Sequence, residues 1–184
     1  MRLHARGLPI TLDVEGARVV VLGDGEASDR RVAFLRECGA EVVRASDVVD
    51  SELDGAKLAM LCTRDPVLAE KLHAATRARG ILCWCEDDPP HSDLAMPAVA
   101  QLGDARITIS TAGHSPALAG RLRAAFESGF DDRLAAFVAA LGELREQLTQ
   151  TEPDPERRRE QLQRAVDGFT VELTVAYPAW FRPR

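Results

Sequence analysis

A short apolar run that ends in a pair of glycines constrains the fold of this chain more than any other feature. Residues 19–22 read Val-Val-Val-Leu, Gly23-Asp24-Gly25 follow at once, and apolar residues then recur at helical spacing from Asp29 to Cys38. A buried strand, a tight glycine turn and a helix start present backbone N–H groups to an anion such as a pyrophosphate. Side chains at the two glycine positions would hold phosphates away from the backbone. The pattern favours a dinucleotide-binding unit of Rossmann type, although Ser28 stands at the third small position.

The rest of the first half repeats the alternation of strand and helix. Further strands are expected at 41–44, 58–62 and 81–85, and a helix that begins at Pro66 should end at Gly80. This order is typical of right-handed crossovers and of a parallel sheet covered by helices. The sequence therefore predicts an α/β fold with a Rossmann-like parallel sheet.

Ligands of such sheets bind at the carboxyl ends of the strands. Three polar segments should meet there, namely the glycine turn, Thr63-Arg64-Asp65, and the acidic segment that begins at Glu86. Asp47 follows the second strand about 20 residues beyond the glycines, where an acid that binds the adenosine ribose belongs. A solvated loop aspartate is the alternative interpretation of Asp47.

The pattern changes after Pro97. Residues 98–110 read as a hairpin, Ser115-Pro116 opens a helix as N-cap and first helical residue, and the chain from Asp131 onward is expected to be helical. The predicted domains are a nucleotide-binding domain at 1–96, a dimerisation segment at 97–130 and a helical domain at 131–184. A hairpin and helix of this size have little core of their own, so we expect a homodimer.

Composition excludes several classes of function. The formal net charge of −6 argues against general nucleic-acid binding. No stretch reaches the roughly 18 apolar residues of a membrane helix, and the first residues lack the apolar core of a secretion signal, so a cytoplasmic protein is expected. Cys83 and Cys85 could face one side of a strand, but no zinc-type spacing accompanies them, which favours buried small side chains and no metal site.

Several motifs, in order, resemble the siroheme synthase family, the NAD-dependent precorrin-2 dehydrogenases that often double as sirohydrochlorin ferrochelatases. The likeness runs from Leu8-Pro9-Ile10 to about Phe130, and its most specific segment is Ile107-Thr108-Ile109-Ser110-Thr111-Ala112-Gly113-His114-Ser115-Pro116. Other matching segments are Val20–Gly25 with Arg30-Arg31, Gly39–Val42, Cys62–Asp65, Asp87–Pro89 and Met96-Pro97.

The resemblance implies oxidation of precorrin-2 to sirohydrochlorin with NAD as cofactor, and it leaves open the insertion of Fe²⁺, as a substrate, to give siroheme. Asp87 falls on the family's catalytic aspartate, where a base near the macrocycle can accept a proton. The substrate-binding residues would be Gly113, His114, Ser115 and Arg123, which suit the carboxylates of a tetrapyrrole. The cofactor-binding residues would be Gly23, Asp24, Gly25, Glu26, Ala27, Asp47, Val48 and Thr63.

Two other interpretations stay open. A non-catalytic relative that binds a tetrapyrrole or nucleotide, as a sensor or carrier, is supported by Asp24 in the phosphate turn and by Trp84 in a strand position that is often small and polar. A nucleotide-sensing regulatory subunit of a transporter also uses a short Rossmann domain, but the hairpin and turn from Met96 to Ser115 fit it poorly. The chelated metal, iron or cobalt, is equally open.

Overall fold

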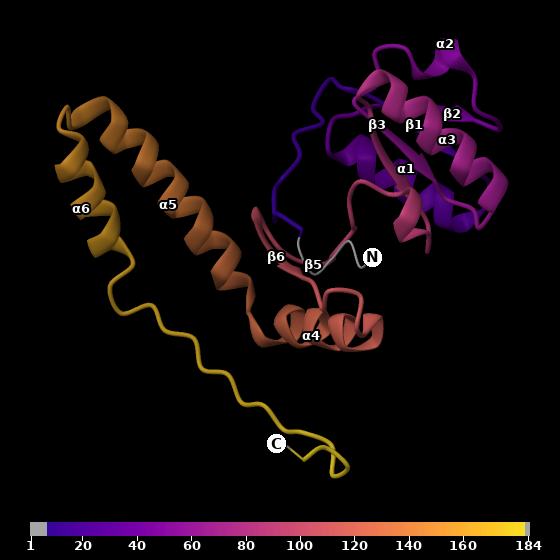
Figure 1. Ribbon diagram of the computed structural model, residues 1–184. Helices are drawn as coiled ribbons and strands as arrows, with labels where there is room; N and C mark the ends of the chain where they lie inside the picture. Colours follow the sequence, from indigo (N-terminus) through magenta and orange to yellow (C-terminus); the bar gives the residue numbers. More distant parts are fainter. Residues whose placement is uncertain (1–6, 183–184) are drawn as a thin grey trace. The chain divides into compact units, whose positions relative to one another are not determined.

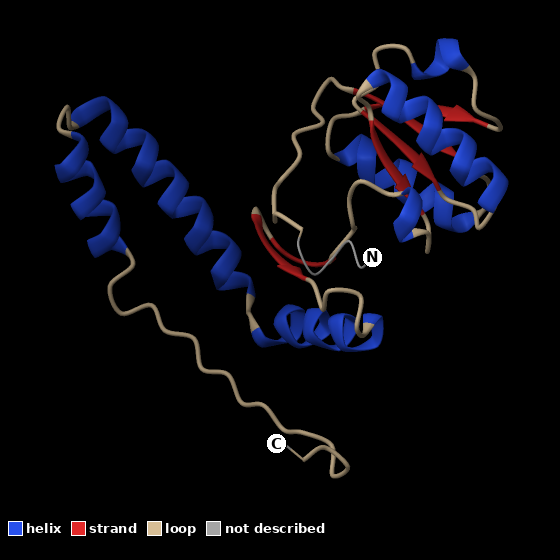
Figure 2. Ribbon diagram, in the orientation of Figure 1, coloured by secondary structure: helices blue, strands red, loops and turns tan. Residues whose placement is uncertain are grey.

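The computed structural model describes residues 7–182, and the first part of this chain forms a four-stranded parallel sheet with the strand order β2-β1-β3-β4. Helices cover both faces of this sheet (Figures 1 and 2). The predicted α/β fold with a parallel sheet is confirmed. The elements are β1 (Arg18–Leu22), α1 (Glu26–Glu37), β2 (Glu41–Ala45), α2 (Asp50–Leu53), β3 (Leu58–Leu61), α3 (Pro66–Arg79), β4 (Leu82–Cys85), the 3₁₀ helix η2 (Pro89–His91), β5 (Ala98–Leu102), β6 (Ala105–Ile109), α4 (Pro116–Gly129), α5 (Asp132–Thr151) and α6 (Pro155–Ala165).

Strand β1 is the core of the sheet because its side chains are buried on both faces. Val20 and Leu22 pack with residues of α2 and α3 on one face, and Val19 and Val21 pack with α1 on the other. A parallel strand sandwiched between helix layers needs apolar residues at every position, which explains the uninterrupted run that the sequence shows there.

Strand order creates a switch point between β1 and β3. The chain leaves β1 for β2 on one side and then crosses β1 to reach β3 on the other side. The two connections therefore diverge at the carboxyl ends of β1 and β3, which is where open α/β sheets hold their ligands.

The edge strand β4 is closed by the loop that follows it. The Cys83 amide donates to Asp93 Oδ2 at 2.9 Å, the Cys85 amide donates to Ser92 Oγ at 2.9 Å, and the Asp93 amide donates to the Cys83 carbonyl at 2.8 Å. These bonds replace the ladder that another strand would supply to an exposed edge.

The chain divides into two compact units. One contains the parallel sheet as far as Ala100 together with Thr108–Ala125, and the second contains Gln101–Ile107 and the chain from Phe126 onward. The three-domain division at residues 96 and 130 stays a prediction. In the second unit α5 and α6 pack as a helical hairpin, and the turn between β5 and β6 lies against α5, because a Cβ on Gly103 would stand 2.6 Å from that of Ala135.

Two predicted elements differ from the structure. Helix α1 begins at Glu26, three residues before the expected start, because Gly25 takes the N-cap position without a side-chain cap. The expectation of helix throughout the last part is wrong beyond α6, since no helix follows Ala165 within the described chain and residues 169–177 carry no regular secondary structure. Among the described residues no helix is long and apolar enough to cross a membrane.

Candidate functional site

The glycine turn and the loop after β3 meet at the switch point. A Cβ on Gly23 would lie 2.5 Å from Thr63 Cγ2 and 3.3 Å from the Cys62 carbonyl carbon, so the two loops are in direct backbone contact. Gly23 also has a φ of +109°, which L side chains rarely adopt. Glycine is therefore required at this position by packing as well as by conformation.

Gly25 leaves open space in front of the start of α1. Its φ of 86° and ψ of −179° lie in a region that is essentially restricted to glycine, and a Cβ placed on it would meet no atom within 4 Å. No side chain caps the helix at this residue. The amides of Glu26 and Ala27 in the first turn thus face an uncapped, positively polarised helix end, which is the arrangement that binds a phosphate.

Ser28 stands at the third small position of the incomplete glycine motif. Its side chain is fully buried at the third small position, where close packing of the helix on the sheet matters more than contact with phosphate. A serine is small enough for that packing. Serine at this position is therefore compatible with the observed geometry of the glycine turn.

The charges around this turn are mixed. Asp24 is exposed within the turn, whereas two acids of the first helical turn are paired, Glu26 with Arg30 and Asp29 with Arg44. Exposed pairs of this kind are worth little in stability, but they reduce the negative field that a phosphate would meet. Asp24 is the residue of this group that most opposes an anion.

Asp47, the predicted ribose ligand, lies beyond the end of β2. Its Oδ1 accepts hydrogen bonds from Lys71 Nζ and from the Val48 amide, each at 2.7 Å. The bond from Lys71 and then the bond from the Val48 amide lower the pKa of Asp47, so the group is a carboxylate at neutral pH. A ribose hydroxyl would have to share Asp47 Oδ1 with Lys71 or bind Asp47 Oδ2.

The predicted catalytic residue, Asp87, lies in the turn after β4 and is ion-paired with Arg64. Arg64 belongs to the loop between β3 and α3, so the pair joins the carboxyl ends of two neighbouring strands. Asp87 has a positive φ of 54°, which aspartate and asparagine tolerate better than other non-glycine residues. Its carboxylate is mostly exposed and available to a substrate.

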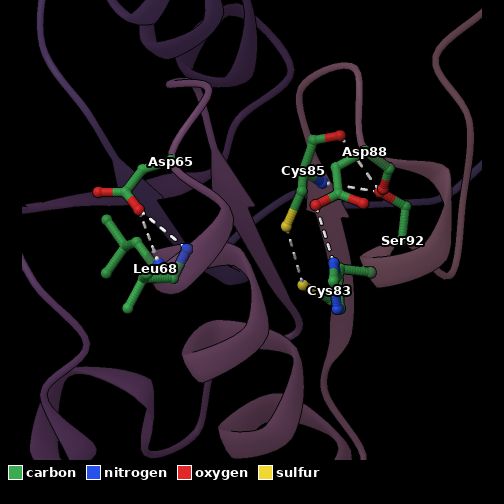
Figure 3. A network of polar contacts seen from close by, with 8 residues as sticks. Asp65, Leu68, Cys83, Cys85, Asp88 and Ser92 are labelled. Carbon is green, nitrogen blue, oxygen red and sulfur yellow. Dashed lines mark hydrogen bonds and ion pairs between the residues drawn. The ribbon is translucent and has the colours of Figure 1, made fainter.

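Polar side chains hold the turn that carries Asp87 in place. Ser92 Oγ donates to the Asp88 carbonyl at 2.8 Å, and Asp88 Oδ2 lies 2.8 Å from His91 Nδ1. Figure 3 shows Ser92 beside the end of β4 and Asp65 at the start of α3. Sequence reasoning placed Arg64 in a polar segment at this edge but did not predict its pairing with Asp87, and it missed Ser92, because these partners are distant or lie in irregular loops.

The two cysteines of β4 are buried beside each other, with their sulfur atoms 3.8 Å apart. The contact with Cys83, followed by burial, raises the pKa of Cys85, so this thiol stays neutral at physiological pH. Within the described part of the chain, no three His, Cys, Asp or Glu side chains are grouped to hold a metal ion.

On the other face of the sheet, Arg31 of α1 contacts Trp84 of β4. The guanidinium carbon of Arg31 lies 4.8 Å from the centre of the Trp84 ring, a cation–π contact. Burial raises the pKa of the nearby Cys62 thiol, although Arg31 opposes that effect. The bulky Trp84 is thus accommodated by the arginine of α1.

The predicted substrate residues form a separate turn before α4. Thr111 Oγ1 accepts the Ser115 amide at 3.2 Å and donates to the Ser115 carbonyl at 3.0 Å, while Ser115 Oγ accepts the Leu118 amide at 3.1 Å. Ser115 is therefore the N-cap that the sequence predicts. Gly113 and His114 lie within this turn, and Arg123 lies on α4.

A cavity of about 510 Å³ lies in the second unit, between α5 and α6, and not at the glycine turn. Its lining includes Arg145, Arg158 and Arg159. The predicted nucleotide site is thus marked by backbone geometry, whereas this cavity belongs to the helical hairpin.

Comparison with known proteins agrees with this geometry. Residues 44–98 match a family model described as "Putative NAD(P)-binding". The siroheme synthase of Methylococcus capsulatus is 27% identical over 91% of this chain, and that of Nitrosococcus oceani is 28% identical over 66% of it. The resemblance to the siroheme synthases is confirmed. The chain spans 40% of the length of the Methylococcus relative and 30% of the Nitrosococcus relative.

A solved structure has the same fold as this chain. The chain superposes on SirC, a precorrin-2 dehydrogenase, with a TM-score of 0.67 and 20% identity, covering 88% of this chain and 90% of that one. At that coverage the likeness extends beyond the parallel sheet into the second unit. The fold of the chain is therefore a known one.

Proposed function

We propose that the protein oxidises precorrin-2 to sirohydrochlorin with NAD⁺ in the synthesis of siroheme. The observation that carries the proposal is the uncapped helix start behind Gly25 at the switch point of a parallel sheet. The siroheme synthase relatives and the precorrin-2 dehydrogenase fold supply the substrate class.

The residues present fit a dinucleotide. The open space in front of Gly25 would take the pyrophosphate, with the amides of Glu26 and Ala27 as donors, and Asp47 and Val48 would lie toward the ribose. Thr63 faces the same turn from the loop after β3. When bound, NAD⁺ accepts the hydride that leaves the macrocycle.

Asp87 is proposed as the base of the reaction. Its exposed carboxylate would take the proton that the oxidation releases, while Arg64 orients the carboxylate through their ion pair. The same carboxylate could accept pyrrole protons if Fe²⁺ is inserted as a substrate. The ferrochelatase step is the second activity to be tested.

Substrate carboxylates would be bound at the turn before α4. Pro116 has no N–H, and the Leu118 and Ala119 amides already bond to Ser115, which leaves the Ala117 amide at this helix start within the described chain. One amide cannot hold several carboxylates. Arg123 and the backbone around Gly113 and His114 would therefore share that role. We also propose a homodimer located in the cytoplasm.

The test is an anaerobic incubation with precorrin-2 and NAD⁺, followed by the visible spectrum of sirohydrochlorin. Asp87→Asn should lower turnover at least ~100-fold while leaving the Kd for NAD⁺ unchanged, because asparagine keeps the positive φ and removes only the base. The neighbouring Glu86→Gln is the matched control and should keep its activity. Unchanged turnover in Asp87→Asn would remove Asp87 from the mechanism.

The same assay distinguishes the proposed dehydrogenase from a non-catalytic sensor or carrier. A wild-type protein that binds NAD⁺ or the tetrapyrrole without forming sirohydrochlorin would support a non-catalytic role, for which Asp24 in the phosphate turn is the structural argument. Adding Fe²⁺ and comparing siroheme formation with a protein-free reaction tests the chelatase step.

A further inference from the structure

The contact between α5 and α6 lacks the apolar seam that usually joins two packed helices. Helices of a hairpin normally bury leucine-like side chains at the positions that face each other. In this hairpin (Figure 1) no residue of α6 is buried, and a cavity of about 510 Å³ lies between the two helices. The side chains of α6 and its C-cap that line the cavity recur at helical spacing and are Pro155, Arg158, Arg159, Leu162, Gln163 and Val166.

The cavity carries three positive charges and no negative one. Arg158 and Arg159 line it from α6 and Arg145 lines it from α5, and none of the other lining residues is charged. We call these three residues the cavity arginines. The chain as a whole is acidic, with a formal net charge of −6. Guanidinium groups that share one cavity repel one another, so an anion placed between them is favoured.

The acids of α6 and of the turn before it do not neutralise the cavity arginines. Asp154 pairs with Arg157 and Glu160 pairs with Arg164, each at 3.6 Å, and neither of these two arginines lines the cavity. Within residues 7–182, the cavity arginines form no ion pair. Their charges therefore remain available to a ligand.

Arg158 is held in position by the backbone of α5. Its Nη1 donates to the carbonyl of Glu152, the C-cap of that helix, at 2.6 Å. A guanidinium has five N–H donors, so this bond leaves others for an anion. A side chain that is already ordered loses less conformational entropy when a ligand binds. Arg158 is thus the preorganised member of the three.

The remaining lining residues indicate the class of anion. Pro155, Leu162 and Val166 give the cavity an apolar part. Arginine binds phosphoryl oxygens through two parallel hydrogen bonds, and its plane also stacks on aromatic rings. Adjacent phosphoryl groups concentrate more negative charge in a short span than a carboxylate does. The cavity volume lies within the range of about 300–1,000 Å³ that is usual for small-molecule sites.

We propose that this cavity binds an organic phosphate with adjacent phosphoryl groups and an aromatic portion, the class that includes nucleoside diphosphates and triphosphates. The phosphoryl groups would contact the cavity arginines, and the aromatic portion would lie against Leu162 and Val166. The cavity belongs to the second unit, whereas the glycine turn belongs to the first. The proposed site is therefore additional to the NAD⁺ site.

Calorimetric titration of the whole chain with ATP, at low salt and without divalent cations, tests the proposal. Arg145→Gln and Arg159→Gln should each raise the Kd for ATP at least about fivefold, because each removes one charged contact. Both residues are exposed, so circular dichroism should show wild-type helix content for the variants. Arg157→Gln removes the same charge from the same helix outside the cavity, and this matched control should change the Kd by less than about twofold.

Three results would overturn the proposal. A wild-type chain that does not bind ATP would exclude the site, and an equal loss of affinity in Arg157→Gln and Arg159→Gln would mean a general attraction to a basic helix. Inorganic tripolyphosphate lacks an aromatic portion and should bind several-fold more weakly than ATP, so equal Kd values would contradict the assigned class.

The Kd for NAD⁺ separates this site from the one at the glycine turn. Arg159→Gln should keep the wild-type Kd for NAD⁺, because the glycine turn lies in the other unit. A parallel loss of affinity for ATP and NAD⁺ would place both ligands in one site and would contradict the proposal. The readout for ATP does not depend on turnover of precorrin-2, so it stands or fails separately from the proposed activity.

Discussion

At the scale of single residues, Gly23 shows how closely the two loops of the candidate site are packed. Gly23→Ala should lower the free energy of unfolding by about 2–4 kcal/mol, because the new Cβ meets Thr63 Cγ2 at 2.5 Å and the φ of +109° disfavours alanine. Adding Thr63→Ser removes the methyl group and should restore about 1 kcal/mol. Urea denaturation measures the unfolding free energy of both variants. A double variant no more stable than Gly23→Ala would contradict the close approach of position 23 to Thr63 Cγ2.

Asp24 lies in the same turn, and we expect its charge to weaken the binding of an anion there. Asp24→Asn should tighten NAD⁺ binding about fivefold at low salt, because it removes one negative charge near the expected pyrophosphate. The gain should shrink at about 1 M salt, where screening is strong. Titration calorimetry at two ionic strengths measures this, with Asp24→Glu as the control that keeps the charge. Equal Kd values for Asp24→Asn and wild type would place the phosphates elsewhere.

At the scale of elements, Asp65 begins α3 and thereby fixes the loop that holds Thr63 and Arg64. Its Oδ1 accepts the amides of Val67 and Leu68, each at 3.0 Å (Figure 3). Asp65→Ala should cost about 1 kcal/mol of unfolding free energy. Asp65→Asn keeps an acceptor oxygen and should cost less. The fluorescence of Trp84, in a Trp180→Phe background, would follow this transition, and a smaller loss in alanine than in asparagine would exclude the cap.

Elements with a strong local pattern were predictable from sequence, and those that depend on distant partners were not. The apolar run of β1 and the Ser115 cap each carry their signal within a few residues. The pairing of Arg64 with Asp87 joins two loops 23 residues apart, and no periodicity encodes it. The early start of α1 was missed because Gly25 lacks the capping side chain that usually marks a helix start.

The last part of the chain was mispredicted for a different reason. From Leu134 to Leu148 apolar residues recur at helical spacing, and α5 confirms the predicted helix, but this period does not continue past α6. From Phe169 the apolar residues recur every second position, and β-branched residues are frequent. Extending the helical interpretation over this segment overlooked a change of period from about 3.6 to 2.

At the scale of the whole molecule, the two units should differ in local stability. Residues Val19–Leu22 of β1 are at most 1% exposed, whereas α6 contains no buried residue. In hydrogen exchange, amides of α6 should exchange about a hundredfold faster than those of β1, because they can open without breaking the sheet. Equal protection of α6 and β1 would mean that both units unfold in one cooperative step.

The closed edge of β4 has a consequence for how copies of this molecule can meet. Ser92 and Asp93 occupy the amides that an incoming strand would need, so the parallel sheet has no vacant ladder at that end. A neighbouring chain cannot add a strand beside β4, even at high concentration. Crowding therefore does not promote strand pairing beside β4, because two short polar side chains block this edge.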